Sequence, residues 1–302
     1  MSESYGPKRT MDKSEWDPGA TEFTKELIDQ KIKFCLAFRG WKHLAWLIRC
    51  SGIPFTSLKI IEVGCGTGTL SLIFALAGAS VTLIDFNRNM LESAKKIYAL
   101  YGCRAEFIET DCLAEPPAEL LGKFDLAISA GLVEHFRDVD RKKVIAYHRL
   151  LLKVGGIAYI GVPNRWSPFY QWIRLARILT GTWKSSVEIP FSSRELKSAA
   201  KETGFSNSYV LGNASLVKDL VVYSRGFISV IAEALPGTLS KQLKTIKHSL
   251  PKEVNATVQD RCIIEETVKT SLDRSAEQGR AGAVAEAIDD NFSAGIVLFA
   301  FR

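Results

Sequence analysis

The sequence lacks the paired cysteines and histidines from which structural metal sites and disulfide frameworks are built. Its six cysteines are scattered, with no C-x-x-C pair and no histidine at ligand spacing from them. We therefore expect neither a zinc site nor a disulfide framework, and we assign no metal. This cysteine usage is typical of a reducing compartment, so the expected location is the cytoplasm.

Signals for export, for crossing a membrane and for binding nucleic acid are also missing. Residues 1–17 are polar and mixed in charge, so no signal peptide is expected. Residues 63–84 form an uncharged run of 22 residues, but four glycines interrupt it. This run predicts a strand, a turn, a helix and a second strand rather than a transmembrane segment. The net charge of +6 is not gathered in one basic stripe, so nucleic acid is not an expected partner.

What the sequence does contain is a regular alternation of short apolar strands with helices. The composition, 47% hydrophobic and 24% charged in 302 residues, is that of a globular protein. We expect strands at 58–63, 80–84, 105–109, 124–130, 157–162, 205–211 and 295–301, and helices at 69–76, 87–100, 137–152 and 192–201. This order predicts an α/β fold, a doubly wound and mostly parallel sheet that helices cover on both faces.

Two segments outside this alternation are expected to be helical. Between Phe23 and Ile48, apolar residues recur every three or four positions, which predicts one amphipathic helix or a pair broken at Gly40. Residues 213–291, before the final strand, also have a mainly helical pattern. The second segment is open to three interpretations: part of a substrate pocket, a homodimer contact, or a surface that rests on lipid.

A glycine-rich turn follows the first expected strand, with the sequence Glu62-Val-Gly-Cys-Gly-Thr-Gly68. Glycines there allow a sharp turn and a close approach by a ligand, and the next helix start offers free N–H groups. Asp85 ends the second strand, where a carboxylate can accept hydrogen bonds from a ribose diol. A dinucleotide fingerprint requires a glycine at the sixth position from Gly64, but this position is Thr69. An adenosine-like ligand is therefore expected, and the glycine spacing disfavours an NAD-dependent oxidoreductase.

The turn resembles the first motif, E/D-x-G-x-G-x-G, of class I S-adenosylmethionine-dependent methyltransferases. Four further segments resemble later motifs in the same order: 85–91, 111–112, 124–136 and 152–156. The resemblance covers residues 57–211 and the last strand, and it is nearest to the ubiquinone-biosynthesis-like and related small-molecule methyltransferases. It implies a Rossmann-like seven-stranded sheet with an antiparallel last strand. The implied cofactor is S-adenosyl-L-methionine, with S-adenosyl-L-homocysteine as product.

The resemblance also implies site residues, position by position. The donor-binding residues would be Glu62, Gly64, Cys65, Gly66, Gly68, Asp85, Phe86, Met90, Asp111, Cys112, Ala130 and Gly131. Asp85 would hold the ribose hydroxyls, Asp111 the adenine amino group, and Gly131 would approach the sulfonium. His135 is a candidate base for the acceptor, with simple packing as the alternative. We expect Glu134 to be a helix-start carboxylate and give it no catalytic role.

Residues 165–184 hold five aromatic and four basic residues and no acidic residue. We interpret this segment as either a core-packing helix or a lid over the acceptor, with Trp166, Tyr170, Arg174 and Arg177 as substrate-binding candidates. Arg174 and Arg177 are three residues apart and could share an anionic group. We divide the chain into an N-terminal helical segment (1–56), a donor-binding core (57–164), the lid (165–191), the end of the core (192–212), a helical insertion (213–293) and a final core strand (294–302).

The function that these features favour is methyl transfer from S-adenosylmethionine to a small organic acceptor, apolar or partly anionic. The main alternative is a protein that binds the donor without catalysis and acts as a regulatory or scaffold subunit. A methyltransferase of RNA or protein is a further alternative. The fourth strand ends in Ser129-Ala-Gly131 rather than the N/D-P-P-Y signature that is typical of base-amino methylation.

Overall fold

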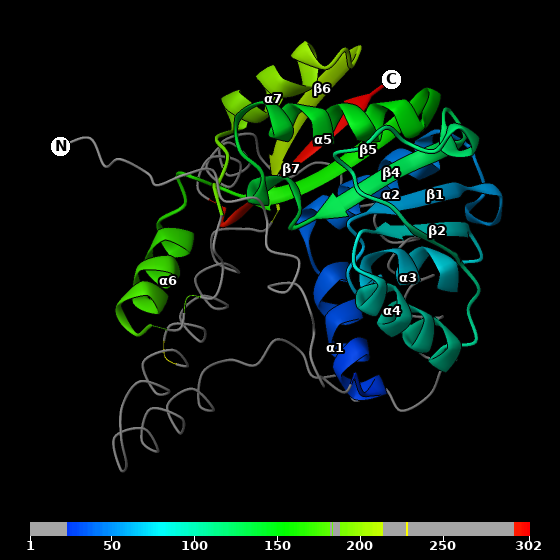
Figure 1. The fold of residues 1–302 in the computed structure, drawn as a ribbon, viewed down its shortest axis with the longest axis horizontal. Helices are drawn as coiled ribbons and strands as arrows, with labels where there is room; N and C mark the ends of the chain where they lie inside the picture. Colours follow the sequence, from blue (N-terminus) through cyan, green and yellow to red (C-terminus); the bar gives the residue numbers. More distant parts are fainter. Residues whose placement is uncertain (1–22, 182, 184–187, 214–227, 229–292) are drawn as a thin grey trace.

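The computed structural model describes residues 23–181, 183, 188–213, 228 and 293–302. Its centre is a seven-stranded sheet in the order β3-β2-β1-β4-β5-β7-β6 (Figure 1). The strands are β1 (Lys59–Val63), β2 (Ser80–Asp85), β3 (Glu106–Glu109), β4 (Phe124–Ala130), β5 (Leu152–Pro163), β6 (Asn207–Gly212) and β7 (Gly295–Phe301). The first five pair in parallel, so the predicted α/β class is confirmed.

The last strand, β7, lies between β5 and β6 and runs antiparallel to both. Each of its residues from Gly295 to Phe301 pairs with a residue of β5, from Pro163 back to Ile157. Its apolar side chains are almost completely buried, because a strand with two neighbours and two covered faces meets little water. The implied antiparallel last strand is therefore present.

Helices cover both faces of the sheet (Figure 1). They are α1 (Lys25–Leu36), α2 (Arg39–Cys50), α3 (Thr69–Leu76), α4 (Arg88–Leu100), α5 (Asp138–Leu151), α6 (Pro168–Leu179) and α7 (Ser193–Glu202). Buried side chains of α1 to α4 form one hydrophobic cluster against the sheet, and those of α5 and α7 belong to a second cluster on the other face. Figure 1 shows α6 standing away from the sheet, on the side to which β4 and β5 point.

The N-terminal helices confirm a broken pair but not its predicted break. The chain turns at Ala37 and Phe38, and Gly40 lies inside α2. Gly40 is needed for packing, because a Cβ there would lie 2.6 Å from Asn213 Oδ1 and 3.0 Å from Val297 Cγ2. The glycine therefore lets α2 approach β7 closely.

The uncharged run from 63 to 84 forms the end of β1, a turn, α3 and β2, as predicted. In the described part of the chain, no helix is long and apolar enough to cross a bilayer. The expected helical insertion at 213–293 lies outside the described residues, apart from Asn213, Ile228 and Ser293. Lys184 of the expected lid lies outside them too.

Candidate active site

The glycine turn joins β1 to α3 at the carboxyl edge of the sheet, where ligands of parallel α/β sheets bind. Gly64, Gly66 and Gly68 all have left-handed φ angles, of 61°, 52° and 65°. A side chain is strained in that conformation, so the turn needs glycine. At Gly66 the one atom near the position of an added Cβ is Met90 Cε, at 3.3 Å. Gly66 therefore presents bare backbone, the kind of surface that a nucleoside can approach. At Gly64 and Gly68 an added Cβ would instead lie 2.5 Å from Leu132 Cδ1 and 2.7 Å from Leu83 Cδ1, so these two glycines are needed for packing.

Asp85, at the end of β2, ties this turn to the next helix. One carboxylate oxygen accepts the Gly66 N–H at 2.9 Å, and the other accepts the Asn87 N–H at 2.9 Å. A carboxylate has about four acceptor sites, so each oxygen keeps a lone pair for a ribose hydroxyl. Burial raises the pKa of Asp85, although these backbone N–H groups oppose the rise. The residue therefore fits the role of holding a ribose.

Glu62, near the end of β1, is joined to the helix that follows the turn. Its carboxylate is buried and accepts the Ser71 N–H of α3 at 3.0 Å. Burial raises the pKa of Glu62 to about 7, and the Asp85 charge adds to the rise. Cys65, in the turn, is buried as well, and burial raises the pKa of its thiol well above the usual value. Neither the thiol of Cys65 nor that of Cys112, whose pKa burial raises to about 12, is an activated nucleophile.

The predicted adenine-contacting residues lie at the ends of β2 and β3. Phe86 and Met90 are half-buried, and Met90 lies in the first turn of α4. Asp111 is exposed, and its carboxylate accepts the Leu113 N–H at 2.9 Å. The Thr110 N–H donates to the Asp85 carbonyl at 3.0 Å, which brings the ends of the two strands together. The structure thus gathers these residues beside Asp85.

The end of β4 completes this edge on the other side of β1. Ala130 and Gly131 are exposed, and the Gly131 N–H donates to the Gly161 carbonyl of β5 at 3.1 Å. His135 ends the short 3₁₀ helix η4 (Val133–His135) and is half-buried. It follows Gly131 closely in the chain, so it lies near the end of β4.

Glu134 lies in the first turn of the short helix η4, ahead of α5, which begins at Asp138. Its side chain is buried, and its Oε1 lies 3.7 Å from where a Cβ on Gly131 would be. Among the described residues, its Oε2 has no hydrogen-bond partner. Burial raises the pKa of Glu134 to about 8, with a further rise from Glu188 and an opposing effect of Arg141. The sequence offered no signal for this burial, because it depends on a segment far along the chain.

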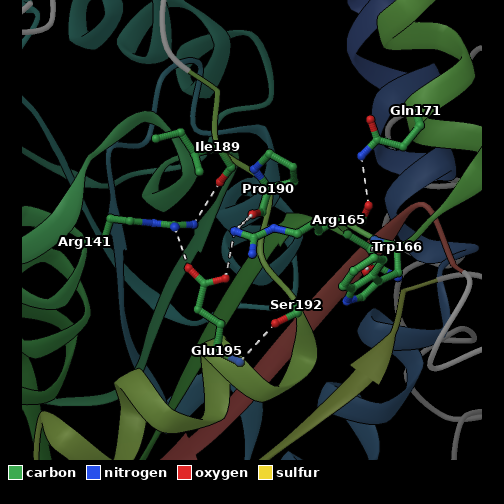
Figure 2. A network of polar contacts seen from close by, with 9 residues as sticks. Arg141, Arg165, Trp166, Gln171, Ile189, Pro190, Ser192 and Glu195 are labelled. Atoms are coloured by element: carbon green, nitrogen blue, oxygen red, sulfur yellow. Dashed lines mark hydrogen bonds and ion pairs between the residues drawn. The ribbon is translucent and has the colours of Figure 1, made fainter. Parts of the chain in front are cut away.

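That segment is residues 188–190, and a network of ion pairs and hydrogen bonds holds its Ile189 and Pro190 (Figure 2). The Ile189 N–H donates to the Glu134 carbonyl at 2.8 Å. Arg141 of α5 donates to the Ile189 carbonyl at 2.8 Å and to Glu195 of α7 at 2.6 Å. Arg165 donates to the Pro190 carbonyl at 3.1 Å and pairs with the same Glu195 carboxylate at 3.0 Å. We call residues 188–190 the strap.

The predicted lid residues lie on or beside α6. Tyr170 is buried and donates its hydroxyl to Glu188 of the strap at 2.6 Å. Arg174 is half-buried over the Trp183 ring, with its Cζ 5.7 Å from the ring centroid. Trp166 and Arg177 are exposed, and so is Trp172. The structure therefore connects Tyr170 to the strap and places Arg174 over Trp183, whereas the side chains of Trp166 and Arg177 are exposed.

Within the described residues, no group of three His, Cys, Asp or Glu side chains could hold a metal ion. The five described cysteines are all free. The donor set at this edge is made of carboxylates, glycine backbone and aromatic rings, which suits a nucleoside.

Comparisons with known proteins agree with this geometry. Residues 60–156 match the family model of a methyltransferase domain. A ubiquinone biosynthesis O-methyltransferase of Bartonella bacilliformis is 35% identical over 136 residues, 45% of this chain and 50% of that protein. Its counterpart in Pelagibacter ubique is 32% identical over 120 residues, 39% of this chain and 47% of that protein. The chain thus spans about half the length of these curated relatives.

The solved structure of a Haemonchus contortus phospholethanolamine N-methyltransferase 2, in complex with S-adenosylhomocysteine, shares the fold. Its TM-score is 0.50 at 16% identity, covering 96% of this chain and 60% of that chain. The family match lies on β1 to β5, the strands that carry the glycine turn, Asp85 and Gly131. Over residues 60–156 the chain therefore matches a methyltransferase domain, and the curated relatives that it resembles are methyltransferases by name.

Proposed function

We propose that this protein transfers the methyl group of S-adenosylmethionine to a hydroxyl of a small organic acceptor. The observation that carries the proposal is the bond between the Asp85 carboxylate and the Gly66 N–H at 2.9 Å, which places a ribose-binding acid against a bare glycine turn. The choice of a hydroxyl acceptor is supported by the curated relatives, which are O-methyltransferases by name.

In the proposed arrangement, the donor lies along the carboxyl edge of the sheet from β3 to β4. Asp85 holds the ribose, and Phe86, Met90 and Asp111 surround the adenine on the β3 side. The methionine part then lies on the glycine turn, with Glu62 beneath it, and the sulfonium faces Gly131. This direction is favoured because helix α6, the element after β5, lies on the side to which β4 and β5 point.

A sulfonium supplies an activated methyl group, so the task left to the protein is alignment. An attacking oxygen must lie in line with the carbon–sulfur bond at about 3–3.5 Å from the methyl carbon. The oxygen then forms the new bond, and the carbon–sulfur electron pair stays on sulfur. The hydroxyl proton leaves to a base, for which we propose His135 on the basis of its position after Gly131.

For the acceptor we propose an apolar molecule with an anionic group, held under α6. Tyr170 contributes an aromatic wall, and Arg174 has a buried Nε with no hydrogen-bond partner among the described residues. Trp166 and Arg177 would close over the acceptor from the exposed side. Loss of acceptor binding in the R174A/R177A variant, with donor binding retained, is the expected result.

The test is incubation of the full chain with methyl-labelled S-adenosylmethionine and separate pools of small phenols, alcohols and fractionated metabolites, followed by mass spectrometry. Label on an acceptor oxygen supports the proposal. Donor binding without transfer to any pool would favour the regulatory or scaffold alternative. Binding of NAD in place of S-adenosylmethionine would favour an oxidoreductase.

The proposed location is a reducing compartment such as the cytoplasm, supported by the five free cysteines of the described residues. A homodimer or a peripheral membrane contact remains a proposal for residues 213–293. The molecular mass of the purified chain in solution tests the homodimer. Binding of the chain to lipid vesicles tests the membrane contact.

A further inference from the structure

The unpaired carboxyl of Glu134 is the feature that the alignment role above does not use. Its side chain is 3% exposed, and its Oε2 is buried without a hydrogen-bond partner among the described residues. Buried polar atoms in proteins are almost always paired, so an orphaned carboxyl oxygen needs an explanation. A ligand group that is not part of the chain is one such explanation.

Few groups around Glu134 would stabilise its carboxylate in the ionised form. The positive charge of Arg141 of α5 lowers the pKa of Glu134, but the Arg141 guanidinium donates its hydrogen bonds to Glu195 and to the Ile189 carbonyl. Glu188 of the strap adds a second negative charge, and the Tyr170 hydroxyl of α6 is already donated to Glu188. Burial thus holds the pKa of Glu134 at about 8, so that near neutral pH most of the carboxyl is protonated.

The position of the carboxyl indicates which charge it would face. Oε1 lies 3.7 Å from the Cβ position of Gly131, the exposed residue at the end of β4. In the arrangement proposed above, on which this inference rests, Gly131 is the residue nearest the sulfonium. A positive sulfur there would meet a buried carboxyl in surroundings where charges interact strongly.

We propose that Glu134 is the counter-charge of the sulfonium, losing its proton when the methylated donor binds and regaining one when the demethylated product is left. The carboxylate then favours the positively charged donor over the neutral thioether product. By linkage, a group that ionises more readily in one complex strengthens binding of that ligand as the pH rises. The affinity for donor relative to product should therefore increase with pH.

Comparison of the two ligands isolates this effect. S-adenosylmethionine and S-adenosylhomocysteine share the adenosine and amino-acid groups, so contacts with Asp85, Asp111 and Glu62 contribute to both complexes. They differ in the methyl group and its positive charge. Any difference that comes from the amino groups of the free ligands is also present in a variant that lacks the Glu134 carboxyl.

The experiment is isothermal titration calorimetry of both ligands against the full chain at several values between pH 6.5 and pH 8.5. If the donor lowers the pKa of Glu134 by one unit, the ratio of product Kd to donor Kd should rise about sixfold over this range. Titration at pH 7.5 in buffers of different ionisation enthalpy should show release of about half a proton more for donor than for product.

In the E134Q variant, the contribution of Glu134 to the pH dependence of the ratio of product Kd to donor Kd should be lost. The additional proton release on donor binding should vanish too, while the product still binds. E134D, which keeps a carboxyl, should keep part of both effects. D125N is the matched control: Asp125 is near the opposite end of β4, where it accepts the Lys59 N–H and pairs with Lys153. It should behave as the wild type.

The inference would be overturned if the ratio of product Kd to donor Kd changed with pH in the same way in the wild type and in E134Q. Failure of either ligand to bind the wild-type chain would instead overturn the proposed function. Should E134Q fail to fold, E134D takes its place, and proton release that is the same in E134D and the wild type for both ligands contradicts the proposal.

Discussion

The Asp85 carboxylate accepts the Gly66 N–H at 2.9 Å, which joins the turn after β1 to the end of β2. The other oxygen of the same carboxylate accepts the Asn87 N–H at the start of α4. One side chain thus joins two loops and keeps acceptor sites that a ribose could use. Because Asp85 holds both loops and is the proposed ribose ligand, we expect its substitution to reduce donor affinity strongly.

In D85N, an amide replaces the carboxylate, so the bonds to the two backbone N–H groups and to the ribose hydroxyls lose the negative charge. We expect the affinities for S-adenosylmethionine and for S-adenosylhomocysteine both to fall about 10- to 100-fold, because hydrogen bonds to a charged group contribute about 1.5–3 kcal/mol. Calorimetry with S-adenosylhomocysteine measures the loss. D125N, a change near the other end of the neighbouring strand, should bind the product normally, and an equal loss in both variants would contradict the assignment.

In G66A, the added methyl group lies on the surface that the donor is proposed to contact. The φ of 52° strains any L residue, and the new Cβ lies 3.3 Å from Met90 Cε. The left-handed conformation costs about 1–2 kcal/mol. We therefore expect a modest loss of stability together with a large loss of donor affinity.

The control for G66A is G155A. Gly155 has a φ of 82° and no atom within 4 Å of its Cβ position, so it has the strain without the site. G155A should lose stability to a similar degree in chemical denaturation and keep its donor affinity. Normal donor binding by G66A would show that the turn is not the binding surface.

The buried pair His148 and Ser129 should make the fold sensitive to acid. His148 Nδ1 lies 2.7 Å from the Val144 carbonyl, which can only accept, so Nδ1 carries the proton and Nε2 accepts from the Ser129 hydroxyl at 3.0 Å. Burial lowers the pKa of His148 to about 4, against an ordinary value of 6.5. Between these values the unfolded chain binds the proton and the folded chain does not, so this contribution to stability falls as the pH falls from 6.5 to 4.

The size of this contribution is roughly 3 kcal/mol over the whole window. The buried carboxyls work in the opposite direction, because the raised pKa values of Glu62 and Glu134 cost stability as the pH rises from 4.5 to about 7 and 8. Urea unfolding of the wild type and H148Q at pH 5 and pH 7 separates them, since the carboxyls are common to both proteins. If the unfolding free energy of the wild type minus that of H148Q were the same at pH 5 and at pH 7, His148 would not be buried as a neutral group.

Loosening the strap should affect the acceptor more than the donor. In E195Q, Arg141 and Arg165 both lose their carboxylate, which frees the residues that hold the Ile189 and Pro190 carbonyls. We expect a loss of about 1–2 kcal/mol in unfolding free energy, because the pair is partly exposed, and a raised KM for the acceptor. Donor affinity should change little.

E202Q is the matched control for E195Q. Glu202 also joins α7 to α5, through Lys142 at 2.5 Å, but both of these side chains are about half exposed. Exposed ion pairs contribute little, so E202Q should match the wild type in stability and in KM. Equal effects of E195Q and E202Q on acceptor KM would contradict a specific role for the strap.

The sequence by itself determined the parallel part of the fold and the position of the glycine turn and Asp85 at the edge of the sheet. Strands and helices alternate with clear apolar periods, and glycine and aspartate mark strand ends, so β1 to β5, the turn at Gly64 and the place of Asp85 follow from local patterns. Positive φ angles at the glycines explain why that motif can be read without a structure. Such signals lie within a few residues of the feature that they predict.

The tertiary structure decided what depends on contacts between distant segments. Gly40 was predicted as a helix break but serves close packing against Asn213 and Val297, which no local pattern encodes. The burial of Glu134 depends on a strap more than 50 residues later, held by the pair of Arg141 with Glu195. The pKa of a carboxyl follows from how much water and which charges surround it, and these are set when the strap packs onto the end of the sheet.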